Sequence, residues 1–442
     1  MTNLKRLRNP YLGVAFIALF IALGVGQSAF EKLTAAQGRG SAQAPSFKVD
    51  PLWPKPLPNH WILGSVTGVA VDAQDHIWLV HRGADSLNAR TEIGLATNPP
   101  TAETCCAPAP PVLEFDQAGT LVGHWGGAGQ GYEWPQSPGG ITIDAKGNVW
   151  ITAAGVNDSS ANRGRPAPDE SGGRATGAAG GGAAAAGGQA QGNRGARGGT
   201  PAPPRPQDAH VLKFSRTGQF LLQIGHAGKV EGNDSQTGLN RPTNVEVDTA
   251  ANEVYVADGF GNHRVVVFDA NTGAYKRHWG AYGEKPDDAN LGPYNPSAPP
   301  AKQFRTVSSV RLAKDGKVYV CDRKNNRVQV FQKDGKFVKE AFISKTTTGE
   351  GSVWDVAFSK DPQQRFLYVA DGQDQKIFVL LRETLEVVTS FGDGGRWPGY
   401  FYAVGSVAVD SKGNVYTGET LEGKRLQKFI YKAPGATSSQ NR

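Results

Sequence analysis

The side chains of this chain that could do chemistry are an arginine and several carboxylates near the ends of short apolar segments. They occur with one serine and two aromatic residues, and the set is Arg82, Asp258, Phe260, Ser308, Asp322, Trp354, Asp355, Asp371 and Glu419. Carboxylates in one site can act as general acid and base when their pKa values are shifted. Aspartate is also an ordinary turn residue, so the surrounding segments decide between the two explanations.

One phrase recurs six times along the chain and explains these segments. It consists of an apolar-x-apolar run, a short polar turn and a second apolar run that contains an aromatic residue. The copies begin at Gly68, Gly140, Asn244, Ser309, Asp355 and Ser406. Period-2 alternation interrupted by polar turns predicts antiparallel hairpins. Because one hairpin cannot bury its own apolar face, six copies predict a radial array.

Most copies continue into a second hairpin, as at residues 265–279 and 328–342. Four strands per repeat predict an all-β protein, a six-bladed β-propeller. The last repeat has only three strands and ends near Tyr431. We expect residues 46–50 to supply its outer strand, because this would remove an open sheet edge.

The repeat also predicts where a site lies. In a propeller, the loops that enter the innermost strands and the loops that leave the second strands open on one face. All nine candidate residues belong to these loops, so we expect them to surround the mouth of the central channel. Irregular backbone on a rigid scaffold is where binding sites are usually built.

Two stretches carry a more specific pattern. VYVAD ends at Asp258 and is followed by Asn262 and Arg264, and VYVCD ends at Asp322 and is followed by Asn326 and Arg327. These stretches resemble NHL repeats. We expect their Asp and Asn side chains to satisfy backbone groups of turns, and their Arg side chains to link neighbouring blades.

Residues 66–430 also resemble the peptidyl-α-hydroxyglycine α-amidating lyase domain, a six-bladed propeller. The matching phrases are VHRG at 80–83, IDAKGNVW at 143–150, RPTNVEVD at 241–248 and ADGF at 257–260. The resemblance implies an enzyme that splits a hydroxyglycine-extended peptide into an amide and glyoxylate. It also implies a zinc ion held by three histidines, an Arg and a Tyr near the substrate, and a structural calcium ion.

Most of the family's functional residues are replaced in this chain. The positions of the zinc histidines match Gly139, Ser308 and Gly405, the Tyr matches Phe260, and a calcium-ligand Asp matches Ser406. Only Arg82 is retained. Zinc catalysis needs three protein ligands and an open position, and the eight histidines of the chain offer no replacement set. We therefore expect no zinc, calcium or other cofactor.

The ends and one internal segment differ from the repeats in composition. Three basic residues precede an uncharged apolar stretch, which predicts a signal peptide or membrane anchor over residues 1–30. We expect a linker at 31–45, the propeller at 46–432 and a tail at 433–442. Residues 161–207 are rich in Gly, Ala, Pro and Arg and predict a disordered insertion within the propeller. The propeller should therefore be exported, to the periplasm or the extracellular space, either released or anchored.

Charge and cysteine content narrow the function. Of the formal net charge of +7, the leader supplies +3 and the insertion +4, so the propeller itself is near neutral. This disfavours nucleic acid as a partner. Three cysteines are too few for a disulfide framework. The adjacent Cys105 and Cys106 can bond to each other, one of them can bond to Cys321, or all three can stay reduced.

Two functions from different classes remain open. The lost zinc ligands favour a non-catalytic module whose channel face binds a peptide, glycan or protein, with the membrane as a further partner if the leader is not cleaved. The alternative is a lyase or hydrolase with altered chemistry that combines Arg82 with the surrounding carboxylates.

Overall fold

The computed structural model describes residues 44–89, 91–155 and 206–432. The expected leader, most of the expected insertion and the tail lie outside these ranges. The described residues from Phe47 to Lys432 form one compact unit. Within the described ranges, no helix has the length and apolar character needed to span a membrane.

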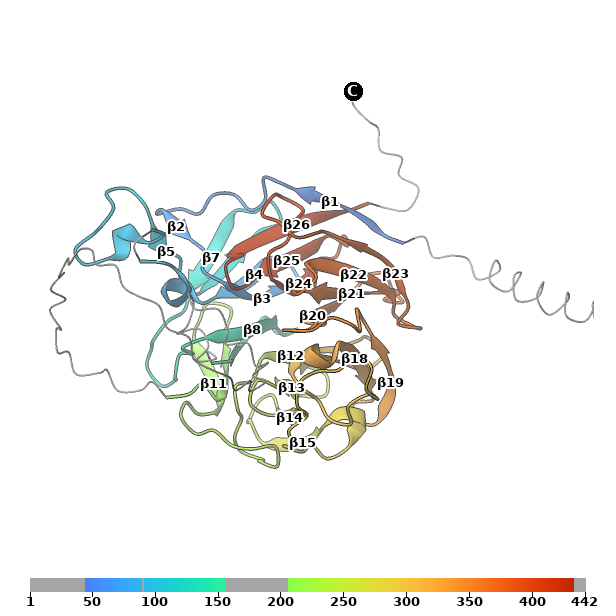
Figure 1. The fold of residues 1–442 in the computed structure, drawn as a ribbon. Coiled ribbons are helices and arrows are strands. Elements are labelled where there is room, and N and C mark those ends of the chain that lie inside the picture. Colours follow the sequence, from blue (N-terminus) through green and yellow to red (C-terminus); the bar gives the residue numbers. More distant parts are fainter. Residues whose placement is uncertain (1–43, 90, 156–205, 433–442) are drawn as a thin grey trace, which may run out of the picture. The chain divides into compact units, whose positions relative to one another are not determined.

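Six four-stranded antiparallel sheets make up this unit, and they are arranged around a common centre (Figure 1). The prediction of a six-bladed β-propeller is therefore confirmed. Blade 1 contains β3 (Val66–Val71), β4 (Ile77–His81), β6 (Val112–Phe115) and β7 (Leu121–Trp125). Blade 2 contains β8 (Pro138–Ile143), β9 (Val149–Ala153), β10 (His210–Phe214) and β11 (Phe220–Gly225). Blade 3 contains β12 (Asn244–Asp248), β13 (Glu253–Asp258), β14 (Arg264–Asp269) and β15 (Tyr275–Trp279).

The remaining blades follow the same order from the centre outward. Blade 4 contains β16 (Val307–Leu312), β17 (Val318–Asp322), β18 (Arg327–Phe331) and β19 (Phe337–Phe342). Blade 5 contains β20 (Asp355–Phe358), β21 (Phe366–Asp371), β22 (Lys376–Leu381) and β23 (Val387–Phe391). Blade 6 contains β24 (Val404–Val409), β25 (Val415–Glu419) and β26 (Arg425–Lys432). Outside the blades are β2 (Trp61–Ile62), which pairs with β5 (Ala107–Pro108), and the 3-10 turns η1 (Gly83–Ser86), η2 (Gly94–Ala96), η4 (Ala281–Gly283) and η5 (Arg323–Asn325).

The outer strand of blade 6 comes from the other end of the propeller sequence. The sheet order is β1-β26-β25-β24, where β1 is Ser46–Asp50. The Phe47 ring lies 4.7 Å from the ring of Phe391 and 5.6 Å from that of Tyr368, both in blade 5. The N-terminal strand is thus the outer strand of blade 6, as predicted from the three-stranded sixth repeat, and it also contacts blade 5.

The hydrophobic core lies between neighbouring blades. In one interface, Tyr255 and Trp279 of blade 3 pack with Val310 and Phe331 of blade 4. The innermost strands contact one another in sequence, and β24 contacts β3, so the ring is closed. Each blade therefore buries its two apolar faces against its neighbours, which one isolated repeat could not do.

Hydrogen bonds explain the Asp and the aromatic residue of the recurring phrase. Asp144 Oδ1 accepts the N–H groups of Lys146 and Asn148, both at 2.9 Å, and its Oδ2 accepts the indole N–H of Trp150 at 3.1 Å. The same Asp-to-aromatic contact recurs as Asp72 with Trp78 and Asp410 with Tyr416, both at 3.0 Å. The Asp closes the hairpin turn and fixes a core side chain at the same time.

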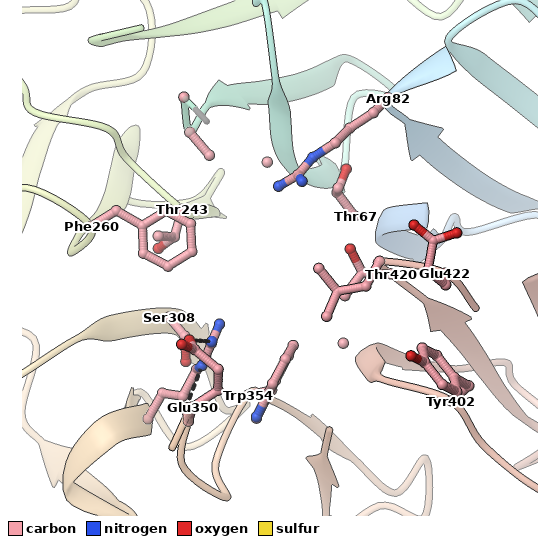
Figure 2. Close-up of a pocket in the computed structure, with 16 residues that line it drawn as sticks. Thr67, Arg82, Thr243, Phe260, Ser308, Glu350, Trp354, Tyr402, Thr420 and Glu422 are labelled. Atoms are coloured by element: carbon pink, nitrogen blue, oxygen red, sulfur yellow. Dashed lines mark hydrogen bonds and ion pairs between the residues drawn. The ribbon is translucent and has the colours of Figure 1, made fainter. Parts of the chain in front are cut away.

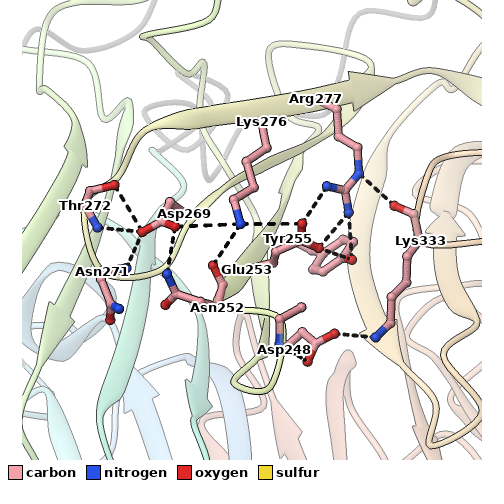
Figure 3. Close-up of polar contacts among 11 residues, drawn as sticks. Asp248, Asn252, Glu253, Tyr255, Asp269, Asn271, Thr272, Lys276, Arg277 and Lys333 are labelled. Carbon is pink, nitrogen blue, oxygen red and sulfur yellow. Dashed lines mark hydrogen bonds and ion pairs between the residues drawn. The ribbon is translucent and has the colours of Figure 1, made fainter.

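Charged side chains connect blade 3 to the turn between β18 and β19 of blade 4 (Figure 3). Arg277 donates to both carboxylate oxygens of Glu253 at 2.7 Å and, through Nε, to the backbone oxygen of Lys333 at 2.8 Å. The hydrogen bonds from Arg277 lower the pKa of Glu253 to about 2. The Lys333 ammonium pairs with Asp248. These contacts hold the blades together at a distance from the channel.

The structure shows how the three cysteines are paired. Cys105 and Cys106 are bonded to each other, in the long loop between β4 and β6. Cys321 is unbonded and fully buried in β17. The pairing of Cys321 with either of the other two is therefore excluded.

Candidate functional site

Four innermost strands carry a β-bulge close to the same end. In β3, Val66 pairs with His81 and Gly68 with Val80, so Thr67 is an extra residue. The pairing of β8, β16 and β24 shifts in the same way, at Gly139–Gly140, at Ser308 and at Gly405. A bulge bends its strand and changes the direction of a side chain, and bulges are common beside active sites. Each of Thr67, Gly139, Ser308 and Gly405 directly precedes a copy of the recurring phrase.

These bulges line a pocket of about 450 Å³ at the end of the central channel (Figure 2). The residues that precede the other two copies of the phrase, Thr243 and Trp354, also line the pocket, so all six such residues belong to the pocket lining. We call these six residues the mouth ring: Thr67, Gly139, Thr243, Ser308, Trp354 and Gly405. The other lining residues come from the loops above the ring and are Arg82, Ala154, Gly155, Phe260, Arg323, Glu350, Tyr402, Thr420, Leu421 and Glu422.

One wall of the pocket is built from stacked flat groups. The guanidinium of Arg323 lies 3.8 Å from the ring centroid of Trp354 and 6.0 Å from that of Phe260. Its Nε donates to the backbone oxygen of Glu350 at 2.7 Å, and its terminal nitrogen pairs with the Glu350 carboxylate. The indole N–H of Trp354 donates to Gly351 O at 2.6 Å. The wall therefore combines two aromatic rings with a guanidinium whose positive charge is matched by Glu350.

Arg82 reaches the pocket from another side. Figure 2 shows its guanidinium extending from the side opposite Ser308 and Glu350 toward the middle of the pocket. His81, the neighbouring residue, is fully buried, and its Nδ1 accepts the N–H groups of Gly64 and Gly83 at 3.0 Å. Burial lowers the pKa of His81 to about 4. The neutral imidazole therefore ties the backbone just after Arg82 to the segment that enters β3.

Of the nine candidate residues, the structure brings four together in the pocket: Arg82, Phe260, Ser308 and Trp354. The five carboxylates do not line it. Asp258, Asp322 and Glu419 are fully buried, and each accepts hydrogen bonds from an arginine on the next strand: Arg264 at 2.9 Å, Arg327 at 2.9 Å and Arg425 at 2.7 Å, respectively. These three pairs support loops of the pocket face. Asp258 and Asp322 also accept backbone N–H groups, of Asn240 and Arg305 respectively, both at 2.9 Å, which is the role that the NHL pattern predicted for them.

Arg264 shows how such a pair supports a loop. Its terminal nitrogens donate to the backbone oxygens of Asn233, Ser235 and Gly238, at distances between 2.5 and 2.8 Å. These oxygens belong to the segment that enters blade 3 from blade 2. The buried Asp258 carboxylate holds the arginine in position, so the loop is fixed from inside the blade.

Asp371 occupies the corresponding position in blade 5 but lacks this pair. Its register partner is Lys376, and no ion pair joins the two among the described residues. Asp371 Oδ1 accepts the N–H groups of Gln373 and Asp374, whereas its buried Oδ2 has no hydrogen-bond partner in the described part of the chain. Burial raises the pKa of Asp371 to about 8. This shift favours the neutral form of Asp371 at pH 7.

Below the pocket, Arg311 crosses the channel. Its NH2 nitrogen lies 3.0 Å from Asp355 Oδ2, and its NH1 nitrogen lies 3.4 Å from Thr142 Oγ1 and 3.5 Å from Glu246 Oε2. Burial raises the pKa of Glu246 to about 7, and the nearby charge of Arg311 opposes this shift. These contacts reach blades 2, 3 and 5 from blade 4. They form a polar network in the channel that includes the candidate residue Asp355 and lies outside the pocket lining.

The residues present do not fit the zinc ion that the family resemblance implies. The three matched positions do converge, since Gly139, Ser308 and Gly405 all line the pocket. However, none of the described lining residues is a histidine or cysteine. A Cβ atom on Gly139 would lie 2.4 Å from Thr152 Oγ1 and 2.8 Å from Thr243 O. Gly139 is therefore packed so closely against its neighbours that a larger side chain, such as a metal-binding histidine, would not fit without a shift of the backbone.

A cluster with metal-ligand chemistry exists elsewhere in the described residues. Ligand atoms of Asp72, His76 and Glu114 lie within 4.8 Å of one another at the hairpin turn between β3 and β4. The guanidinium of Arg216 contacts all three: 2.9 Å to Asp72, 3.1 Å to His76 and a further contact to Glu114. Arg216 thus already supplies the positive charge, and the cluster links blade 2 to blade 1.

Comparisons with known proteins agree with this architecture. A family model for the NHL repeat matches residues 239–268 and 304–331, which lie in blades 3 and 4. The chain is 36% identical over 151 residues to peptidyl-glycine alpha-amidating monooxygenase B of Xenopus laevis, covering 30% of this chain and 16% of that protein. It is 28% identical over 243 residues to NHL repeat-containing protein 3 of Mus musculus, covering 51% of this chain and 60% of that protein.

Among solved structures, a streptogramin B lyase aligns with a TM-score of 0.45 and 9% identity, covering 88% of this chain and 98% of that one. The chain spans less than a quarter of the length of the amidating monooxygenases that it matches. The protein is thus a six-bladed β-propeller that contains NHL repeats. Within that class, it is homologous to peptidylglycine alpha-amidating monooxygenase and to NHL repeat proteins.

Several lining residues were missed by the sequence reasoning. Thr67 and Thr243 occupy the same position of the phrase as Ser308, so superposing the six copies would have found them. Arg323 and Glu350 carry no such signal, because they meet through a loop between β19 and β20 whose path the sequence does not specify. Tyr402 lies in the loop that enters β24, a loop type that the repeat does assign to this face.

Proposed function

We propose that this protein is an exported or membrane-anchored propeller that acts as a non-catalytic binding module. The pocket at the channel mouth takes one small organic ligand that carries a carboxylate group. The observation that carries the proposal is the mouth ring. All six blades place the residue before the recurring phrase in one pocket, with Arg82 directed into it, and none of these residues can bind zinc through a nitrogen.

The chemistry of the lining supports the class of ligand. A volume of about 450 Å³ lies within the range of small-molecule sites. An arginine can bind a carboxylate through two parallel hydrogen bonds. The wall of Trp354 and Phe260 suits an apolar or planar group beside that carboxylate. Because several relatives are named for peptidyl-glycine, the carboxylate end of a short peptide is the ligand we propose.

The described lining residues include no histidine or cysteine, which supports binding without zinc. The proposed module holds its ligand without metal, cofactor or turnover. The alternative, an enzyme related to the amidating lyase with altered chemistry, requires groups that activate water or take up a proton. In the proposed function, the carboxylates Asp258, Asp322 and Glu419 support loops and do not touch the ligand.

Calorimetric titration tests the proposal. The probe is acetyl-Phe-Gly with a free carboxylate, and acetyl-Phe-Gly amide is its neutral counterpart. The free acid should bind and the amide should bind much more weakly. Arg82→Met should weaken binding of the acid by roughly tenfold or more, since a hydrogen bond to a charged group contributes about 1.5–3 kcal/mol. The matched control is Arg365→Met, which removes a mostly exposed arginine paired with Asp361.

Two results would overturn the proposal. Equal binding of acid and amide would show that the pocket does not recognise a carboxylate. One zinc per chain by elemental analysis, together with glyoxylate release from a hydroxyglycine peptide, would establish the enzyme instead. Export is tested separately: cell fractionation and N-terminal sequencing of the mature protein should place the propeller outside the cytoplasm.

A further inference from the structure

We infer that three aromatic residues beside the pocket form a surface that binds the part of a peptide extending out of it. This aromatic track consists of Trp397, Tyr400 and Tyr402, in the loop that enters β24. Their side chains are among the exposed large apolar groups of the described residues, with 78%, 46% and 39% of their surface accessible, respectively. The inference rests on the proposed function, because it extends the same site.

Hydrogen bonds fix the backbone of the loop that carries these exposed aromatic side chains. Arg425 donates to the backbone oxygens of Arg396 and Tyr400 at 2.5 and 2.7 Å. Arg425 is in turn held by both oxygens of the fully buried Glu419, at 2.7 and 2.9 Å. Gln427 Nε2 adds a second hydrogen bond to Tyr400 O at 2.9 Å. The loop therefore presents Trp397 from a backbone tied to β25 and β26.

A fixed loop makes the aromatic track an efficient binding surface. An aromatic side chain on a rigid backbone loses little conformational entropy when it binds, so more of the gain from burying it is retained. Trp and Tyr are also the residues that most often dominate binding energy at interfaces. Trp397 is 78% exposed and lies in one loop with two further exposed aromatic residues, and grouped exposed apolar side chains mark interaction sites.

The aromatic track is continuous with the pocket. Tyr402 belongs to both, because it lines the pocket as well. Arg396 lies 4.6 Å from the ring centroid of Tyr402 and donates to the backbone oxygen of Glu422, another lining residue, at 2.9 Å. From Tyr402 the track runs back along the loop through Tyr400 to Trp397. The N–H of Tyr400 donates to Trp397 O at 3.0 Å, so a single turn of backbone brings these two residues together before Tyr402.

A peptide fits this arrangement better than an oligosaccharide does. The pocket volume of about 450 Å³ accommodates only the end of a chain, so a peptide held by its carboxylate must continue across the rim. Apolar side chains of that continuation would cover Trp397 and Tyr400 and would gain about 25 cal/mol for each Å² of apolar surface removed from water.

The test compares ligands of different length on one protein. The short probe is acetyl-Phe-Gly acid. Two longer probes add three residues before the same end, Leu-Tyr-Leu in one and Ser-Asn-Ser in the other. Calorimetry should show that the Leu-Tyr-Leu peptide binds about tenfold more tightly than the short probe. The Ser-Asn-Ser peptide should gain little.

Variants assign that gain to the aromatic track. Trp397→Ala should abolish the advantage of the Leu-Tyr-Leu peptide and leave the affinity for the short probe unchanged. The matched control is Leu52→Ala, which removes a side chain that is 85% exposed outside the track. If each long peptide binds Trp397→Ala as tightly as it binds the wild type, this inference is wrong and the proposed function stays intact. Failure of the short probe overturns the proposed function instead.

A glycan is the remaining occupant that the test must separate. A cello- or chito-oligosaccharide that binds the wild type and loses affinity in Trp397→Ala, while the long peptide shows no such loss, would overturn the peptide assignment.

Discussion

Arg311 and Asp355 form an ion pair inside the channel, with 3.0 Å between NH2 and Oδ2. The pair joins blade 4 to blade 5. Only 12% of the Arg311 side chain and 4% of the Asp355 side chain are accessible. Asp355 also accepts the hydroxyl of Ser309 at 2.6 Å and the N–H of Val407 at 3.0 Å. One carboxylate thus links three consecutive innermost strands, and Arg311 extends the network to Thr142 and Glu246 on the other side.

We predict that Arg311→Met destabilises the propeller by about 3–5 kcal/mol, because removing one partner of a buried ion pair leaves the other charge uncompensated. Urea denaturation followed by circular dichroism measures the change. Arg365→Met is the control, since its pair with Asp361 is largely exposed and should contribute less than about 1 kcal/mol. If both variants lose the same small amount, the channel network does not contribute to closing the ring.

The pH dependence of stability should reveal Asp371. Its folded pKa is about 8, well above its usual value of 3.8. Between these values the folded state binds more protons than the unfolded state, so the free energy of unfolding should fall as pH rises from about 4 to about 8. Asp371→Asn removes this titration. The variant should match wild type near pH 5 and be more stable at pH 8 to 9.

Glu253→Gln is the control for Asp371→Asn, because Glu253 changes the free energy of unfolding with pH in the opposite direction. Arg277 holds the folded pKa of Glu253 at about 2, below its usual value of 4.5. The stability supplied by Glu253 is therefore present above pH 4.5 and is lost as pH falls toward 2. Denaturation curves from pH 3 to pH 9 separate the two. A flat profile for wild type above pH 5 would contradict the assignment of Asp371 as a neutral acid.

The recurring phrase made the architecture predictable, since each copy encodes one hairpin. In three copies an Asp also closes the turn and binds the aromatic residue of the next strand. The supply of the last strand was predictable for the same reason, because counting strands showed that blade 6 was incomplete. The roles of the carboxylates were harder. Asp322 and Asp371 end equivalent strands, yet Asp322 pairs with Arg327, whereas Asp371 faces Lys376 without forming an ion pair.

The site was only partly predictable. Every mouth-ring residue directly precedes a copy of the phrase, which the sequence contains in plain form. Arg323, by contrast, reaches Glu350 and Trp354 only because a loop between two blades folds over it. Loop conformation depends on contacts between segments far apart in the chain, and neither alternation nor spacing encodes these contacts. Trp397 escaped for the same reason, because exposure is a property of the folded surface.

We predict that residues 161–205 are dispensable for folding. This segment falls outside the described residues, but its two ends in the structure are fixed. Asp208 Oδ2 accepts the N–H groups of Ser137 at 2.9 Å and of Gly155 at 3.2 Å, so it holds both ends of the insertion together. Replacement of 161–205 by a short Gly-Ser loop should leave the melting temperature unchanged, since closure cost rises slowly with loop length. Asp208→Ala should lower it by several degrees, and the reverse order would refute the prediction.

We predict that Phe47→Ala destabilises the propeller by about 2 kcal/mol, because its ring joins β1 to blade 5 through Tyr368 and Phe391. Deletion of residues 1–52 should cost more, since it also exposes the edge of β26. Thermal melting of the three proteins gives the order. Lys48→Ala, on the exposed side of the same strand, is the control and should melt like wild type. A truncated protein that melts like wild type would show that β1 does not stabilise the ring.

Gly139 and Gly405 provide a matched test of why the pocket lacks a metal site. Both are bulge residues of the mouth ring, and neither needs a left-handed backbone, so they differ mainly in the space around them. A Cβ atom on Gly139 would lie 2.4 Å from Thr152 Oγ1 and 2.8 Å from Thr243 O, whereas on Gly405 its nearest neighbour would be Thr420 Cγ2 at 3.2 Å. Gly139→Ala should therefore cost roughly 1–3 kcal/mol through overpacking. Gly405→Ala should cost less than about 1 kcal/mol, as measured by urea denaturation.

We therefore expect Ser308→His and Gly405→His to be tolerated, but these two variants supply only two zinc ligands. Gly139→His, which would supply the third ligand, should disrupt the bulge before a zinc site is complete. If Gly139→Ala is as stable as Gly405→Ala, the bulge can shift. The triple histidine variant should then bind zinc in proportion to protein, and the pocket would be a lyase site that lost only its ligands.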